Sequence, residues 1–149
     1  MENFLNMSGS ASLALHAIVF MSAHPEKMVS TNHIASSLGV SEAHLHKVFQ
    51  RLVKTGIVKS IRGPKGGFML RKPLDEIRLL DVFQAIEGPY QPDNCLMDTP
   101  DCKSKSCILG DVIKRVNNLV MGYLSKTKLS QLTEAFEDMN LKQHAEVSK

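Results

Sequence analysis

The sequence predicts a mainly α-helical fold: a winged helix-turn-helix DNA-binding domain with a long C-terminal dimerisation helix. The first observation that predicts this fold class is a pair of short helical patterns separated by a turn at Gly39, as in a helix-turn-helix. Two β-type stretches, residues 57–61 and 67–70, flank a turn rich in glycine at residues 62–66, as in a wing. An apolar helical repeat then runs over residues 109–124. The 149 residues, of which 43% are hydrophobic, suffice for about one domain with a buried core.

Apolar residues at helical spacing predict three helices in the first third of the chain. Residues 10–23 form the first of these helices. The second is short and can be capped by Ser30 or Thr31. The third covers residues 42–55, and Ser41 is its natural N-cap. The apolar positions of the third helix step by 3, 1, 3 and 1 residues, which is the pattern of one buried face.

After the wing, the pattern predicts three helices, with a loop between the first and the second. Residues 80–87 are a short amphipathic helix, and residues 88–105 lack apolar periodicity and are expected to form a loop. The long helix of residues 109–124 follows. A last short helix is expected over residues 132–139, capped by Ser130.

The predicted domain organisation has three parts. Residues 1–88 form the DNA-binding domain, residues 89–107 form a cysteine-bearing sensor loop, and residues 108–149 form the dimerisation helix and C-terminal tail. The long helix carries more apolar surface than one small domain is expected to cover. Helix-turn-helix proteins usually bind paired half-sites as symmetric dimers. We therefore expect a homodimer, the alternative being that this helix packs entirely within one chain.

Positive charge is concentrated in one stretch of the sequence. The whole chain has a net charge of +3, but residues 41–72 hold eight basic residues and one acidic residue, a local charge of +7. The remainder of the chain sums to −4. A basic block in an otherwise acidic chain favours a face that binds a polyanion, with a merely solvated surface as the alternative.

The third helix is predicted to be the recognition helix, because its exposed positions near the N-terminus are short polar or basic groups that suit base and phosphate contacts. At the wing tip, two cations can reach a minor groove. The expected DNA-binding residues are Ser41, Ala43, His44, His46, Lys47 and Arg51 on the helix and Arg62 and Lys65 on the wing. The two histidines are ambiguous, since a surface histidine can simply be solvated. A winged helix that binds another protein is the alternative for the whole domain.

Residues 40–52, 56–60 and 62–68 resemble the signature of the Rrf2 family of bacterial transcription regulators. The block at residues 62–68 is highly specific, and the resemblance extends over about residues 10–125. It implies a dimeric regulator that binds a double-stranded DNA operator and acts as a repressor.

Three cysteines, Cys95, Cys102 and Cys107, have the spacing C-x6-C-x4-C. Thiolates are soft ligands for iron–sulfur clusters and zinc. From the spacing alone, a metal or cluster site, a redox-active thiol pair and inert thiols all remain open, whereas a secreted disulfide framework is not expected. The family resemblance implies an iron–sulfur cluster, of [2Fe–2S] or [4Fe–4S] type, because cluster-binding members carry three cysteines in this loop.

The fourth ligand of such a cluster is not identified by the sequence. The family pattern is nearer C-x5-C-x5-C, so the middle cysteine is displaced here by one position. The two positions that supply the fourth ligand in cluster-binding members correspond here to Gly110 and Ser12. The remaining candidates are Asp98, Asp101, Asp111, His16 or an exogenous ligand.

Several other classes of protein are disfavoured. The sequence has no nucleophile–base pair, no glycine-rich phosphate loop after a strand and no HExxH motif, so we expect no enzyme. No apolar run approaches the roughly 20 residues that cross a bilayer. A signal peptide begins with a positively charged stretch, whereas the first six residues of this chain include no basic residue. We therefore expect a cytoplasmic protein without a membrane partner.

Overall fold

The computed structural model of the chain describes residues 7–91, Cys95 and residues 107–136. Its elements are α1 (Gly9–Ser22), α2 (Thr31–Leu38), α3 (Glu42–Lys54), β1 (Val58–Ile61), β2 (Gly67–Leu70), the 3-10 turn η1 (Leu74–Glu76), α4 (Leu79–Glu87), α5 (Gly110–Lys126) and the 3-10 turn η2 (Leu129–Gln131). This order of helices with one two-stranded sheet is the winged helix-turn-helix fold that the sequence predicts.

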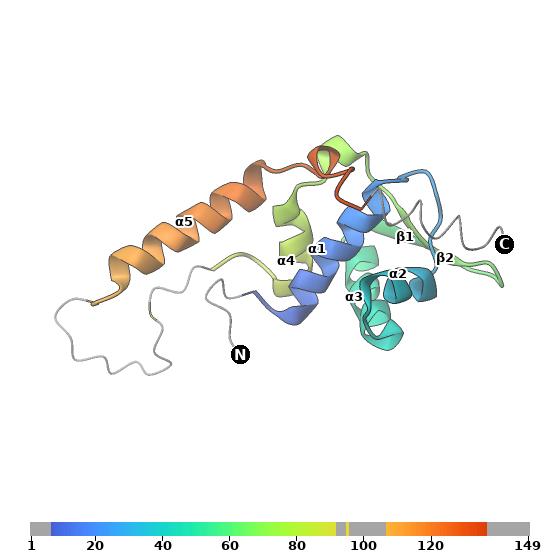
Figure 1. The fold of residues 1–149 in the computed structure, drawn as a ribbon, viewed down its shortest axis with the longest axis horizontal. Helices are drawn as coiled ribbons and strands as arrows, with labels where there is room; N and C mark the ends of the chain where they lie inside the picture. Colours follow the sequence, from blue (N-terminus) through green and yellow to red (C-terminus); the bar gives the residue numbers. More distant parts are fainter. Residues whose placement is uncertain (1–6, 92–94, 96–106, 137–149) are drawn as a thin grey trace.

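Helix α1 is the centre of the domain. It is apolar on almost all sides, and such a helix is stable only when it is surrounded by other elements. It packs against α2, α3 and α4, and Figure 1 shows α4 beside it and α3 below it. Ala14, Ala17 and Ile18 have no exposed surface. None of the described helices has both the length and the apolar character needed to cross a bilayer.

The helix-turn-helix is formed by α2 and α3, and its capping residues are those expected from the sequence. The side chains of Ser30 and Ser41 accept hydrogen bonds from the backbone N–H groups of His33 and His44, which begins each helix. Between the helices Gly39 has a φ of 66°, a left-handed conformation that glycine adopts without strain. The buried residues of α3 are Leu45, Val48, Phe49 and Leu52.

The wing is the antiparallel pair of β1 and β2, in which Val58 lies opposite Leu70. It is fixed to the domain at two places. Val29, in the segment before α2, forms a β-bridge with Phe68. The ring of Phe68 stacks on the ring of Phe49, with 4.5 Å between the centroids. The wing therefore has a defined position relative to α3.

Helix α5 extends away from the domain as an arm (Figure 1). It contacts α4, and only Ile113 and Leu124 along it are buried. After α5 the chain returns to the core, where Leu129 in η2 is fully buried and its N–H donates to the carbonyl of Ile77.

The predicted last helix over residues 132–139 is wrong for residues 132–136, which form a bend and turns. Ser130 lies within η2 and caps no helix there. Tertiary packing explains the difference, because Leu132 and Phe136 both pack against the core and the ring of Phe136 lies 5.9 Å from that of Phe20. Residues 137–139 lie outside the described residues.

Candidate nucleic-acid interface

The outer face of α3 carries the predicted recognition residues. Ser41, Ala43, His44, His46, Lys47 and Arg51 are all exposed. The same helix buries its apolar side, so the polar positions are held at the surface by the packing of Leu45, Val48 and Phe49. Ser41 accepts the N–H of His44 at 3.4 Å, and its hydroxyl is therefore partly used in capping. The structure brings the predicted helix residues together on one surface.

Each histidine of this surface is held by a neighbouring element. Nε2 of His44 shares a hydrogen bond of 3.0 Å with the hydroxyl of Ser10, at the start of α1. The ring of His46 meets the ring of Phe68 edge-on, with 5.9 Å between the centroids. Both histidines remain exposed, so each presents an oriented ring to solvent.

The two basic residues of α3 that are predicted to bind DNA, Lys47 and Arg51, differ in their surroundings. Lys47 is exposed and makes no hydrogen bond or ion pair with another described residue, so its ammonium group is available to a phosphate. Arg51 instead turns toward α4, where Nη1 donates to the carbonyl of Ile86 at 3.3 Å. A guanidinium has further N–H donors, which leaves part of Arg51 available as well.

Arg62 and Lys65 lie in the turn that joins the two wing strands, and both are exposed. The turn requires glycine. A Cβ atom at Gly66 would lie 2.4 Å from the carbonyl oxygen of Ile61, and Gly63 has a φ of 125°. Because β2 is stacked on α3, both cations are carried on a hairpin that is fixed to the recognition helix.

Glu42 is the one acidic residue of the basic stretch over residues 41–72, and the sequence assigns it no role. In the structure its carboxylate accepts hydrogen bonds from the hydroxyl of Thr31 at 3.1 Å and from the side-chain amide of Asn32 at 3.4 Å. Glu42 therefore ties the first turn of α2 to the first turn of α3. The signal that could have identified this contact is an acidic side chain in the first turn of α3 together with two polar side chains in the first turn of α2.

The end of α4 is bonded to two other elements, and we call this group of residues (Ser8, Arg51, Ile86 and Glu87) the α4 junction. Arg51 of α3 binds the carbonyl of Ile86, and the hydroxyl of Ser8, the N-cap of α1, donates to the carboxylate of Glu87. A little further along the chain, Tyr90 donates to a carbonyl of α5. The backbone that leads to the cysteines is thus attached to α1, α3 and α5.

Two of the three cysteines are among the described residues. Cys95 and Cys107 are exposed and free, and Cys102 lies outside the described residues. The backbone of Gly110 lies close to the side chain of Cys107. A Cβ atom at position 110 would lie 3.1 Å from the Cβ and 3.7 Å from the sulfur of Cys107. No side chain at position 110 therefore fills the space beside this thiol. Two exposed, free thiols are the type of ligand that a soft metal or an iron–sulfur cluster takes.

The described candidates for a fourth ligand already have other contacts. Asp111 forms an ion pair with Arg115 at 2.9 Å, both side chains being exposed. Nδ1 of His16 donates to the carbonyl of Ser12 at 2.7 Å, which leaves Nε2 as the nitrogen that can bind a metal. Asp98 and Asp101 lie outside the described residues. Among the described residues, no three His, Cys, Asp or Glu side chains are grouped as a metal site.

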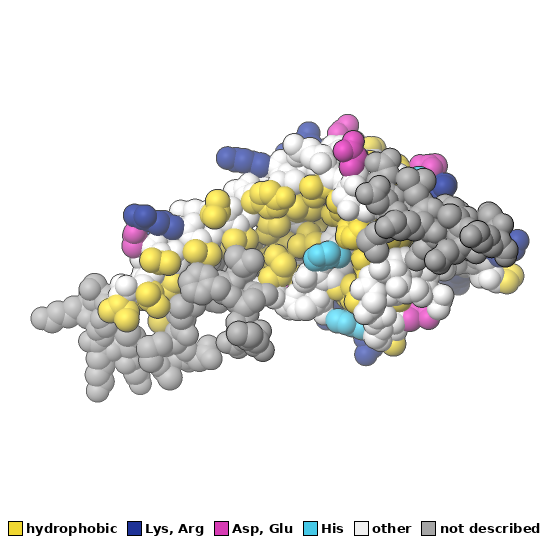
Figure 2. Space-filling model, in the orientation of Figure 1, with side chains coloured by type: hydrophobic (Ala, Val, Ile, Leu, Met, Phe, Trp, Pro, Cys, Tyr) yellow, Lys and Arg dark blue, Asp and Glu magenta, His cyan; other side chains and the backbone are white. Residues whose placement is uncertain are grey.

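A large apolar surface runs along α5. Figure 2 shows hydrophobic side chains along this helix and between it and α1. Leu119 is 74% exposed and Tyr123 is 56% exposed, and Leu109 and Val112 are exposed as well. Beside them lies a hollow of about 330 Å³, and its lining includes Leu15, Val19, Leu79, Tyr123 and Phe136. Contiguous exposed apolar surface of this kind is typical of a protein–protein interface.

Comparison with known proteins identifies similar regulators. A family model described as Rrf2, iron-dependent transcriptional regulator, matches residues 7–135. YwgB of Bacillus subtilis, whose name describes it as an HTH-type transcriptional regulator, is 32% identical over 118 residues, covering 76% of this chain and 75% of YwgB.

Solved structures give the same result. CymR of B. subtilis, described as the global cysteine regulator, matches with a TM-score of 0.70 at 29% identity, over 87% of this chain and 96% of that chain. IscR of T. potens matches with a TM-score of 0.66 at 26% identity, over 87% of each chain. These similarities confirm the predicted fold class.

Proposed function

Because the chain belongs to the Rrf2 family of transcriptional regulators, we propose that it is a cytoplasmic, homodimeric repressor that binds double-stranded operator DNA and is controlled at three cysteines. The observation that carries the proposal is the joint surface of α3 and the wing. Oriented polar and basic side chains of α3 and two cations of the wing are exposed there, on elements locked to each other by Phe68 and Phe49. A helix of this kind fits the major groove, and an extended cation on a wing fits the minor groove.

Each DNA-binding residue has a proposed role. Ala43, His44 and His46 face base edges from the first turns of α3, with Ser10 and Phe68 orienting the two histidines. Ser41 and Lys47 contact phosphates, and so does the free part of Arg51. Arg62 and Lys65 enter or flank the minor groove.

Dimerisation is supported by the apolar surface of α5. In water, an exposed Leu and Tyr on one helix face are stabilised when a second copy covers them, at about 25 cal/mol per Å² of apolar area. A two-fold pairing of α5 places two copies of α3 on one duplex, as paired half-sites require.

The three cysteines would hold an iron–sulfur cluster. Cys95, Cys102 and Cys107 would supply three thiolates, and Cys95 and Cys107 are exposed and free. When bound, a cluster supplies reactivity toward oxidants and nitric oxide at this loop. The description of the matching family model as iron-dependent supports this cofactor.

The α4 junction is the proposed route from the cysteines to the DNA-binding surface. Only Gly88 separates the sensor loop from Glu87, which binds Ser8, and the preceding carbonyl of Ile86 binds Arg51 of the recognition helix. A change in the backbone after α4 therefore alters bonds to α1 and α3 at once. This control acts by selecting between two arrangements of the domain.

A regulator without a cluster is the second candidate, and the two exposed, free thiols favour it. Lys103 and Lys105 lie between Cys102 and Cys107 in the sequence, and nearby cations favour thiolates, which can be oxidised or can bind zinc. The similarity to a cysteine regulator supports this version. The third candidate function is that of a winged helix that binds only other proteins. This candidate predicts no salt-dependent binding of DNA.

One experiment tests the proposed function as a whole. The purified protein is used to enrich duplexes from a random DNA library, and the enriched duplex is titrated by fluorescence anisotropy over a range of salt concentrations. We expect a palindromic site whose affinity falls steeply with salt, with a log–log slope of about −5 or steeper for a dimer that neutralises six or more phosphates. No enrichment, or a slope near zero, would contradict DNA binding.

A further inference from the structure

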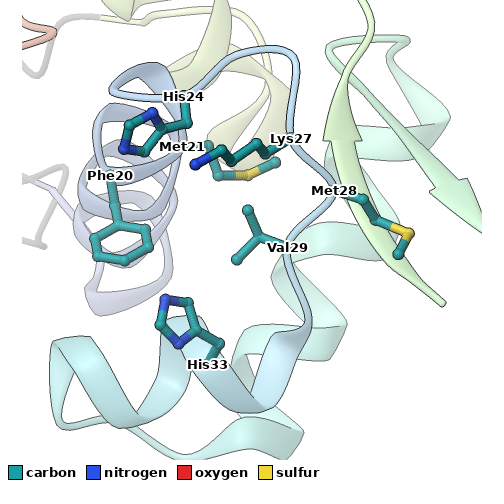
Figure 3. A pocket seen from close by; sticks show the side chains of 7 residues that line it. All are labelled: Phe20, Met21, His24, Lys27, Met28, Val29 and His33. Atoms are coloured by element: carbon teal, nitrogen blue, oxygen red, sulfur yellow. The ribbon is translucent and has the colours of Figure 1, made fainter. Parts of the chain in front are cut away.

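A small hollow that DNA binding does not use lies where the end of α1 faces the start of α2. We call it the His24 pocket, and its volume is about 180 Å³. Its apolar wall is made by side chains of α1 and of the segment after it, and three nitrogen-bearing side chains complete it (Figure 3). The lining residues are Phe20, Met21, His24, Lys27, Met28, Val29 and His33.

The polar groups of the His24 pocket are all basic. Figure 3 shows the amine of Lys27 extending across the hollow on the side of His24, while His33 rises from α2 on the opposite side. The side chains of Lys27 and His24 make no hydrogen bond or ion pair with another described residue. Among the described residues no carboxylate lines the hollow, so no described side chain of its lining balances the positive charge of Lys27.

We propose that the His24 pocket binds a small organic carboxylate that has a compact apolar body. The carboxylate would be bound by the ammonium group of Lys27 and the imidazole N–H groups of His24 and His33, as charge-assisted hydrogen bonds. The apolar body would rest on Phe20 and Val29. A volume of about 180 Å³ is below the roughly 300 Å³ at which pockets begin to take drug-sized ligands, so nucleotides are too large.

The apolar wall distinguishes this ligand from a bare inorganic anion. Phosphate would satisfy the three basic groups but would leave the side chains of Phe20, Met21 and Val29 uncovered. A carboxylate with an aromatic or branched body covers that wall and removes its apolar area from water. The tilted ring pair of Phe20 and His33, 5.8 Å apart, offers an aromatic ring a further edge-on contact.

The position of the pocket gives bound ligand a route to the rest of the domain. Val29 exchanges both backbone hydrogen bonds with Phe68, at 2.9 and 2.8 Å, and Phe68 stacks on Phe49 of the recognition helix. Two residues, Val29 and Phe68, therefore connect a ligand in the pocket to Phe49 of α3. It would also contact side chains of both α1 and α2, and so stabilise the fold.

The test is a titration of the full-length protein with sodium benzoate, followed by two-dimensional NMR in the absence of DNA. We expect saturable shifts of Phe20, Met21, Val29 and His33 with a Kd of about 0.1–1 mM, as suits a ligand of nine non-hydrogen atoms. Benzyl alcohol, which has the same ring without the charge, should bind about tenfold more weakly. Inorganic phosphate should also bind more weakly than benzoate.

Matched lysine variants locate the site. Lys27→Met should weaken benzoate binding about tenfold, since it removes one charge-assisted hydrogen bond. Lys72→Met, which removes an exposed lysine two residues after β2, should leave benzoate binding unchanged. His24→Asn is a second variant, and the dispersion of each NMR spectrum reports whether the variant is folded.

Three results would overturn the proposal. The first is the absence of shifts at these residues at millimolar benzoate. The second is equal binding of benzoate and benzyl alcohol, or of benzoate and phosphate. The third is unchanged benzoate affinity in folded Lys27→Met and His24→Asn. Because none of these measurements involves DNA, their outcome is independent of the proposed repressor function.

Discussion

The guanidinium of Arg51 donates a hydrogen bond to the main-chain carbonyl of Ile86, with 3.3 Å between Nη1 and the oxygen. Arg51 belongs to the last turn of α3, and Ile86 to the last turn of α4. The carbonyls of a final helical turn have no partner within their own helix, and a cation is favourable at that end. One side chain of the recognition helix therefore completes the end of the helix that leads to the cysteines.

Replacing Arg51 by methionine keeps the apolar part of the side chain and removes this hydrogen bond. We expect Arg51→Met to lower the free energy of unfolding by about 0.5–1.5 kcal/mol, as measured by urea denaturation. Lys54→Met is the control, because Lys54 is an exposed cation of the same turn without a hydrogen bond or ion pair to another described residue. Equal effects of the two changes would show that the bond to Ile86 contributes nothing.

Arg62 at the wing tip is expected to contact the minor groove directly. Arg62→Ala should weaken operator binding by about 1–3 kcal/mol in fluorescence anisotropy at fixed salt. Arg115→Ala removes the same charge from α5, outside the helix-turn-helix and wing, and should leave the affinity almost unchanged. If both variants lost affinity equally, the effect would be one of net charge and the wing would have no specific contact.

The turn of the wing depends on Gly66. A Cβ atom there would lie 2.4 and 2.9 Å from the carbonyl oxygens of Ile61 and Gly63, so backbone must move. We expect Gly66→Ala to lower the free energy of unfolding by about 1–3 kcal/mol and to reduce operator affinity. Gly9→Ala is the matched control, because a Cβ at Gly9 has no neighbour within 4 Å. It should be neutral or stabilise the protein by up to about 1 kcal/mol.

Leu119 tests the proposed dimer. It is 74% exposed on the apolar face of α5, and a carboxylate buried in an interface without a partner is strongly unfavourable. Leu119→Glu should raise the dimer dissociation constant by at least about 100-fold, since each of the two copies loses roughly 1.5–3 kcal/mol of apolar burial. Light scattering should then report the mass of one 16.5 kDa chain. Asn118→Glu, on the side of α5 away from the apolar stripe, should remain a dimer.

Much of the fold follows from local sequence signals. Ser30, Gly39 and Ser41 cap helices or end them through interactions within a few residues, and these positions are as predicted. The helix expected over residues 132–139 failed because its apolar residues follow helical spacing but pack against α1 as turns. Local pattern cannot distinguish these two cases, since packing against the core decides between them.

The candidate site shows the same limit. The exposure of the recognition residues follows from the apolar stripe of α3, and it is confirmed for every predicted residue of that helix. The partners of His44 and Arg51 lie 34 and 35 residues away in sequence, at Ser10 and Ile86. No periodicity or motif within α3 identifies such partners, because tertiary packing of α1 and α4 brings them to the helix.

The three cysteines give the last prediction. Replacing Cys95, Cys102 and Cys107 together by alanine should abolish visible absorbance and bound iron and sulfide in protein purified without oxygen. The variant should remain a dimer, because the apolar residues of α5 are untouched. Ser104→Ala, in the same segment, is the control and should retain all three signals. Iron, sulfide and zinc are measured on each protein. Zinc without sulfide in the unaltered protein would contradict the cluster and favour a zinc site, and absence of both would leave thiol oxidation as the means of control.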